Sequence, residues 1–175
     1  NLKNKEFRKF YEILMEDYLD IMAIKKSKKE DDGTRYTLVK KGDDFVFESS
    51  THGTAVLSCM AGNLEGSLYG TAPEAKYVLL KTEVTSSEFI IEEYNYVAGA
   101  EYADSIGADV MKSSLGYTEY DDPTTSHTYA DMDGNTCIVT IGADKAASKG
   151  ILVVSSAGNS GNDPWHFLSA PSDGD

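Results

Sequence analysis

Three short glycine-containing segments carry residues that could cleave a peptide bond. His52 begins the run HGTAVLSCMAG, Ser114-Leu115-Gly116 follows an apolar stretch, and Asn159 stands in Ala157-Gly158-Asn159-Ser160-Gly161 after another such stretch. An imidazole accepts and returns a proton near neutral pH, so His52 is a candidate general base. An amide on a glycine-flanked turn can donate a hydrogen bond to a developing oxyanion, which makes Asn159 a candidate for that role.

Each of these residues also has a plainer interpretation. His52 could simply begin a helix, and Asn159 could hold a turn in a left-handed conformation, which its glycine neighbours would also favour. The order of the three segments along one chain favours the catalytic interpretation. His127 stands in a polar stretch and His166 beside aromatic residues, so both are interpreted as surface or packing residues.

Together the three segments resemble the subtilisin-like serine proteases (subtilases, peptidase S8 family), and the SSLGY and YADMDG stretches resemble those of secreted bacterial members. The resemblance is clear over residues 49–175. It implies a peptidase that forms an acyl-enzyme with a Ser-His-Asp triad, in which His52 is the general base and Asn159 belongs to the oxyanion hole. It also implies that the substrate adds as a strand along Ser114, Leu115 and Gly116. In the same family, the positions of Ser156 and Gly158 line the pocket for the side chain before the scissile bond.

The aspartate and the serine of such a triad have no matching motif in these residues. No Asp-Thr-Gly or Asp-Ser-Gly precedes His52, and no Gly-Thr-Ser follows Asn159. Asp20 lies at a plausible distance upstream, but it stands inside an amphipathic pattern and is not assigned. We therefore expect an incomplete catalytic domain that is inactive alone. The alternative is a pseudoprotease or peptide-binding module that has kept the groove without the chemistry.

Composition limits the partners. The formal net charge of -13 argues against nucleic acid or an anionic membrane surface, because both would repel the chain. No apolar stretch reaches the roughly 20 residues that cross a bilayer. A secreted, periplasmic or cell-surface location is expected, with the signal peptide absent from these residues. Cys59 and Cys137 indicate neither a disulfide framework nor zinc ligands, and Cys59 is expected to be a buried thiol.

The expected fold is α/β, and the resemblance implies a subtilisin-like three-layer α/β/α sandwich around a mainly parallel sheet, in one domain over residues 1–175. Strands are predicted at 77–81, 109–113 and 151–154, and helices at about 90–106 and 137–149. The fully apolar strand at 151–154 is expected to be covered on both faces. Because sites in such sheets form outside the carboxyl ends of the strands, the Ser114 and Asn159 segments should lie there.

Hydrophobic spacing predicts which faces of the helices are buried. One face of the 90–106 helix should be formed by Ile90, Tyr94, Val97, Ala98, Tyr102 and Ile106. In the helix after His52, the buried stripe should contain Ala55, Val56, Cys59 and Met60. Residues 1–48 are less certain: an amphipathic helix is predicted at 1–23, followed by a charged hairpin or loop around the strand-like residues 36–39.

The acidic loop at residues 119–135 raises the question of a metal. Its Asp131-Met132-Asp133-Gly134-Asn135 spacing resembles the first half of a calcium loop, but the distant glutamate that completes such a loop is absent. We prefer a solvated loop, expect no required cofactor, and leave structural calcium open. An acidic calcium-binding or adhesion domain would explain this loop but not the three ordered segments.

The expected partners are a peptide or protein substrate and, for an incomplete domain, a complementary segment or second copy that covers exposed sheet edges.

Overall fold

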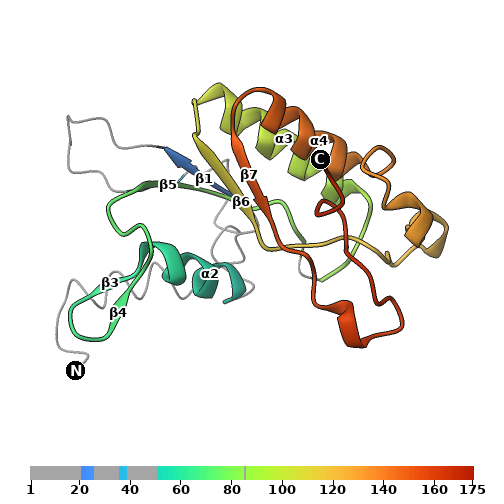
Figure 1. Ribbon diagram of the computed structural model, residues 1–175, viewed down its shortest axis with the longest axis horizontal. Coiled ribbons are helices and arrows are strands. Elements are labelled where there is room, and N and C mark those ends of the chain that lie inside the picture. The colour runs from blue at the N-terminus through green and yellow to red at the C-terminus, as the bar shows by residue number, and fades with distance from the viewer. Residues whose placement is uncertain (1–20, 26–35, 39–50, 85) are drawn as a thin grey trace.

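The computed structural model describes residues 21–25, 36–38, 51–84 and 86–175, with side chains described from residue 51 onward. The predicted helix at 1–23 therefore lies almost wholly outside the described residues, as do Asp20 and most of the charged segment at 25–44. In the described part, the elements that position the site are one large sheet and the helices α2 (His52–Ala61), α3 (Ile91–Ser105) and α4 (Ile138–Ser148) (Figure 1). None of the described helices is long and apolar enough to cross a bilayer.

The large sheet has the strand order β2-β5-β1-β6-β7. Its strands are β1 (Ile21–Lys25), β2 (Tyr36–Leu38), β5 (Lys76–Leu80), β6 (Val110–Ser113) and β7 (Leu152–Ser155). β2 runs parallel to β5 and β6 parallel to β7, whereas β1 is antiparallel to both β5 and β6. Four of these five strands therefore share one direction, and the predicted α/β fold with a mainly parallel sheet is confirmed.

Helices cover both faces of this sheet. Alternate residues of a strand point to opposite faces, and Tyr77 and Leu79 of β5 pack with Leu57 of α2. Val78 between them belongs instead to the larger core, which Met111 of β6 shares with residues of α3 and α4. Figure 1 shows α2 on one side of the sheet and the α3–α4 pair on the other, so the described chain has three layers.

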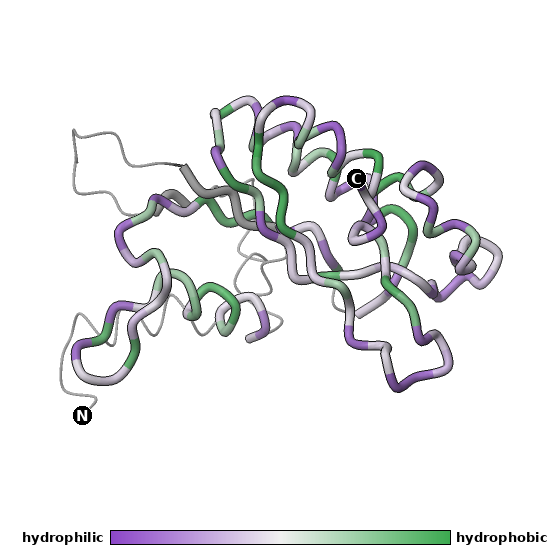
Figure 2. Tube along the Cα trace, viewed as in Figure 1, coloured by the Kyte–Doolittle hydropathy of each residue, from purple (hydrophilic) through white to green (hydrophobic). Residues whose placement is uncertain are grey.

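The prediction that both faces of the last strand are covered is wrong. Leu152 and Val154 of β7 are 61% and 44% exposed, whereas Val153 packs against the core under α3 and α4. β7 stands at the end of the described strand order, so helices reach only one of its faces. Its continuous apolar run, visible in Figure 2, is therefore half-solvated in the described chain.

The predicted apolar face of α3 is only partly buried, because Ile90 and Ile106 pack against the core but Tyr94 and Tyr102 do not. Tyr94 is 52% exposed and Tyr102 37% exposed, although both belonged to the expected apolar stripe. The buried residues of this helix are Glu92, Glu93, Tyr96, Ala100 and Ala103. A hydrophobicity pattern places carboxylates outside, and it misses burial that depends on partners from other segments.

Three smaller predictions also differ from the structure. Cys59 is exposed rather than buried, and in α2 the buried residues are Gly53 and Leu57. Ile21–Lys25 forms β1, so the predicted helix does not extend through residues 21–23. Tyr36–Leu38 is a strand as expected, but it joins the large sheet beside β5 instead of forming a hairpin.

The chain also contains a small two-stranded sheet, formed by β3 (Asn63–Leu64) and β4 (Leu68–Tyr69) directly after α2. Gly70 follows this hairpin and donates a backbone hydrogen bond to Gly62 O at 2.7 Å. A Cβ at Gly70 would lie only 2.2 Å from Met60 O. Glycine is therefore required here for the chain to pass close to the end of α2, which fixes that helix.

Candidate functional site

The parallel register of β6 and β7 brings two of the sequence segments to the same edge of the sheet. Ser113 and Ser155 are register partners at the ends of these strands. Their hydroxyl oxygens are 3.3 Å apart, and Ser156 N donates to Ser113 O at 3.2 Å. The segments Ser114–Gly116 and 156–159 therefore leave the sheet side by side, as predicted for the carboxyl ends of parallel strands.

Ser169 joins these two segments from a third part of the chain. A Cβ placed on Gly116 or on Gly158 would lie 2.4 Å from Ser169 Oγ, so both glycines make room for this one side chain. Ser169 is only 5% exposed. The next residue, Ala170, exchanges backbone hydrogen bonds with Tyr117, with N···O distances of 2.9 and 3.3 Å. No role was predicted for Ser169, because no local pattern marks a contact with glycines of two other segments.

Asn159 does not adopt the left-handed conformation that its plainer interpretation requires. Its φ is -116°, whereas Gly158 before it has φ of +88°. Gly158 thus makes the turn, with its N–H donating to Ser156 Oγ at 3.2 Å. Asn159 is exposed at the start of the short 3-10 helix Ser160–Asn162. The left-handed position of this turn is therefore taken by Gly158 and not by Asn159.

His52 lies in a different layer of the fold. It is the first residue of α2 and is exposed, while the next residue, Gly53, is buried. Leu57, one turn further along, anchors the helix on β5. The imidazole therefore lies on a helix that Leu57 anchors to the sheet and that the Gly70 segment holds at its carboxyl end, which limits its movement. The aspartate and serine that a triad would add are assigned to no described residue.

A buried hydrogen-bond network lies under the loop that follows Gly116. Glu93 of α3 is fully buried, and its carboxylate accepts hydrogen bonds from Tyr120 OH and from Val139 N, the latter at 2.9 Å. His127 Nε2 meets the same carboxylate, and the His127 side chain is only 10% exposed. His127 is therefore not a surface residue, although packing was one of the roles expected for it.

The charges in this network stabilise one another. Burial alone would raise the pKa of Glu93, but the hydrogen bonds from His127, Tyr120 and Val139 together hold it below its usual value. The hydrogen bond to Glu93 in turn raises the pKa of His127. This network ties α3, the loop and the start of α4 together, and it positions the chain behind Ser114–Gly116.

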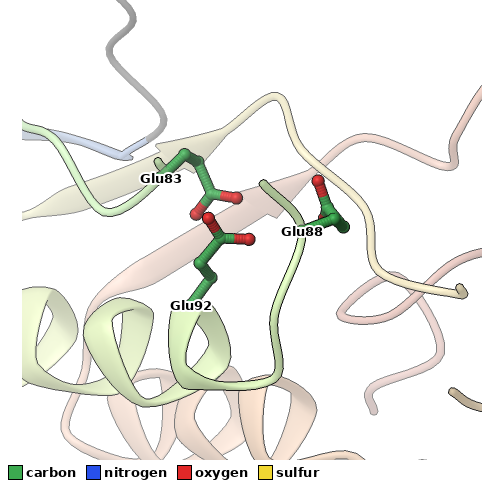
Figure 3. Close-up of side chains that lie close together, drawn as sticks. All are labelled: Glu83, Glu88 and Glu92. Carbon is green, nitrogen blue, oxygen red and sulfur yellow. The ribbon is translucent and has the colours of Figure 1, made fainter. Parts of the chain in front are cut away.

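The acidic loop considered for calcium satisfies its own carboxylates. Asp131 accepts from Thr128 N at 2.6 Å and from the Thr128 hydroxyl at 2.7 Å. Asp133 accepts from the backbone N–H groups of Asn135 and Thr136, both at 2.8 Å. Such local bonds are typical of capped turns and need no cation. Within the described chain, the acidic side chains close enough to share an ion are instead Glu83, Glu88 and Glu92 (Figure 3).

Comparison with known proteins agrees with these features. A sequence model of the subtilase family matches residues 13–173. The chain is also similar to the minor extracellular protease Vpr of Bacillus subtilis (strain 168), with 34% identity over 118 residues. The aligned residues are 67% of this chain but only 12% of Vpr, so the chain spans a small part of the length of the relative that it matches.

Proposed function

Because this chain belongs to the subtilase family, we propose that the protein containing it is a serine endopeptidase. It hydrolyses peptide bonds through an acyl-enzyme intermediate, with His52 as the general base and Asn159 as a donor to the oxyanion. The nucleophilic serine and the triad aspartate are assigned to no residue of this chain.

The observation that carries this proposal is the junction at the ends of β6 and β7. Ser114–Gly116 and the 156–159 turn leave adjacent parallel strands at one edge, and the buried Ser169 links them. An extended peptide can add beside Ser114–Gly116 through its backbone groups. Ser156, Gly158 and Ser169 then form the walls and floor of the pocket for the substrate side chain before the scissile bond.

Each half of the reaction uses the same two residues. His52 takes the proton of the serine hydroxyl as the serine oxygen attacks the substrate carbonyl, and Asn159 donates a hydrogen bond to the oxygen that becomes negative. His52 then returns the proton to the leaving amine, and the peptide C–N bond breaks. Water then attacks the acyl-enzyme while His52 takes its proton, and Asn159 again donates to the oxyanion. His52 passes this proton to the serine oxygen as the ester C–O bond breaks, which releases the carboxylic acid and restores the serine.

We also propose that the protein works outside the cytoplasm. The similar protein Vpr is named an extracellular protease. The net charge of -13 is compatible with a protein that remains soluble and does not bind anionic surfaces. Fractionation of the producing cells tests this proposal, because the protein should be found in the medium, the periplasm or the cell surface. Recovery in the cytoplasm alone would contradict it.

Peptide-hydrolysis kinetics test the catalytic assignment. In subtilisin, itself a member of the family, loss of the oxyanion asparagine costs about 10²–10³ in kcat, and loss of the histidine on the order of 10⁶. We expect losses of these sizes for Asn159→Ala and His52→Ala, with KM nearly unchanged. Asn162→Ala, in the same exposed turn, is the matched control and should keep full activity.

A protein that binds peptides in this groove without hydrolysing them would instead support the pseudoprotease alternative.

A further inference from the structure

Three glutamates from consecutive parts of the chain converge beside the start of α3. Glu83 follows the end of β5, Glu88 lies in the connecting loop, and Glu92 belongs to the first turn of α3. One carboxylate oxygen from each lies within 4.8 Å of the others. Figure 3 shows the carboxylates of Glu83 and Glu92 facing each other, with Glu88 approaching from the loop.

Glu92 supplies a buried oxygen that is aimed into this cluster and has no partner. The residue is only 1% exposed, and its Oε1 accepts a hydrogen bond from Val84 N at 2.8 Å. Its Oε2 is buried without a hydrogen-bond partner among the residues that the structure describes. A carboxylate in the first turn of a helix is favoured by the helix dipole. That effect accounts for one acidic side chain, but not for three that face one another.

Glu83 is held in place by its neighbours. It is 8% exposed, and its Oε1 accepts hydrogen bonds from the hydroxyl groups of Thr82, at 2.9 Å, and of Tyr117. Both bonds use the same oxygen, which leaves Oε2 available to a ligand. Hydrogen bonds of this kind are how proteins orient carboxylates that bind metal ions.

The three carboxylates of the cluster lie close enough to repel one another. Burial and the neighbouring Glu92 raise the pKa of Glu83, and burial raises the pKa of Glu92. Burial, together with the charges of Glu92, Glu83 and Asp121, raises the pKa of Glu88 to about 7. Among the described residues, the charges that contribute to these shifts are carboxylates. A bound cation would relieve the repulsion between these carboxylates.

We propose that Glu83, Glu88 and Glu92 together bind one calcium ion. Oxygen-only ligands select hard cations over zinc, which prefers nitrogen and sulfur. Calcium–oxygen distances of about 2.3–2.6 Å place ligands on opposite sides of the ion about 4.6–5.2 Å apart. The separations of these oxygens, each within 4.8 Å, are compatible with ligands of one calcium ion. Magnesium usually binds only one or two carboxylates and keeps several waters, so a site with three carboxylates suits calcium better. Backbone carbonyls and water would complete the coordination.

Calcium at this position would fix the segment between β5 and α3 to the substrate-binding edge. Tyr117, which holds Glu83, is the residue directly after Gly116. Asp121 accepts a hydrogen bond from Glu88 N at 3.1 Å and donates its own N–H to Glu88 O at 2.8 Å. The ion would thus bind both Glu83, which contacts Tyr117, and Glu88, which contacts Asp121. Its loss should therefore loosen the chain directly after Ser114–Gly116.

Calcium titration of the chelator-treated intact protein tests this site directly, with calorimetry to count the ions bound. We expect Glu88→Gln and Glu92→Gln each to weaken binding of one calcium ion by at least the roughly 10–100-fold that loss of even an outer-shell partner costs. Glu101→Gln, on the exposed face of α3, and Asp133→Asn, in the acidic loop, are the matched controls and should bind like the wild type.

The variants separate this site from any other calcium site in the protein. Glu88 is the more solvent-accessible member compared with Glu92, so Glu88→Gln keeps the test valid if Glu92→Gln fails to fold. Circular dichroism establishes folding for each variant. The proposal is overturned if the wild type binds no calcium. It is also overturned if folded Glu88→Gln keeps wild-type binding, or if only Asp133→Asn reduces it. Peptidase activity plays no part in this readout, so the outcome is independent of the proposed function.

Discussion

Glu92 and Glu93 are neighbours on α3 and equally buried, at 1% and 0% exposure, yet their surroundings are opposite. Glu93 receives hydrogen bonds from Tyr120, Val139 and His127, and its pKa lies below the usual value. Among the described residues, Glu92 has only backbone N–H groups as hydrogen-bond donors, with Val84 N at 2.8 Å, and its carboxylate faces other carboxylates, so burial raises its pKa.

The difference shows two ways in which a fold accommodates a buried carboxylate. The partners of Glu93 belong to the protein itself, so this residue acts as a permanent link between α3, the loop after Gly116 and α4. Oε2 of Glu92 gains a partner only when a proton or a cation is added. We therefore interpret Glu93 as structural and Glu92 as a ligand residue.

The largest expected effect is the loss of the Glu93 carboxylate. Glu93→Ala leaves the Val139 N–H, the Tyr120 hydroxyl and His127 buried without their acceptor, so the free energy of unfolding should fall by about 3–5 kcal/mol. Urea denaturation measures this change. A loss below about 1 kcal/mol, within the ordinary range for surface changes, would contradict the structural role.

Glu92→Gln should behave differently, and its effect should change sign with calcium. Without calcium, the change removes one of several like charges, and we expect the variant to be as stable as the wild type or more stable by up to about 1 kcal/mol. With saturating calcium, the wild type gains binding energy that the variant lacks, so the variant should become the less stable protein. Thermal unfolding with and without chelator checks this reversal. Equal destabilisation under both conditions would make Glu92 structural, like Glu93.

His127→Gln should have an effect that depends on pH. The folded-state pKa of His127 is raised by Glu93, so its contribution to stability is fully present below the unfolded value of about 6.5 and is lost as pH rises through the folded-state value. The variant should therefore lose about 1 kcal/mol at about pH 5.5, allowing for solvent screening, and less at about pH 9. Urea unfolding at both pH values measures the difference. A pH-independent loss would indicate that His127 contributes by packing alone.

The smallest effect is expected for Glu101→Gln, which lies on the same helix but is exposed. Surface substitutions of this kind usually change stability by no more than about 0.5 kcal/mol in either direction. The same unfolding experiments, with and without calcium, should therefore give wild-type values. A larger effect would mean that carboxylate loss anywhere on α3 is disruptive, and the contrast between Glu92 and Glu93 would lose its meaning.

The order of strands and helices was predictable because it depends on local patterns. The helix that became α4 was expected at 137–149, and Gly107 and Gly150, with φ of +69° and +98°, end their helices in the conformation that glycine favours. Burial was less predictable because it depends on distant segments. The exposed face of β7 and the buried Glu92 and Glu93 both contradict the hydrophobic pattern for this reason.

The candidate site shows the same division. The positions of Ser114–Gly116 and Asn159 at one sheet edge followed from strand ends and glycines, which can be recognised in the sequence. Ser169 and the Glu93–His127 pair could not be recognised, because Ser169 lies against Gly116 and Glu93 against His127, each more than thirty positions away. The roles of His52 and Asn159 stay predictions until activity is measured.

The most direct test of the central claim is to treat the natural gene product that contains this chain with a fluorophosphonate probe and to locate the adduct by peptide mass spectrometry. The probe reacts with a serine only when a base activates it. The proposed function predicts one labelled serine, with labelling abolished in folded His52→Ala. A folded, uninhibited protein that takes up no label, or one that His52→Ala labels as well as the wild type, would contradict the claim.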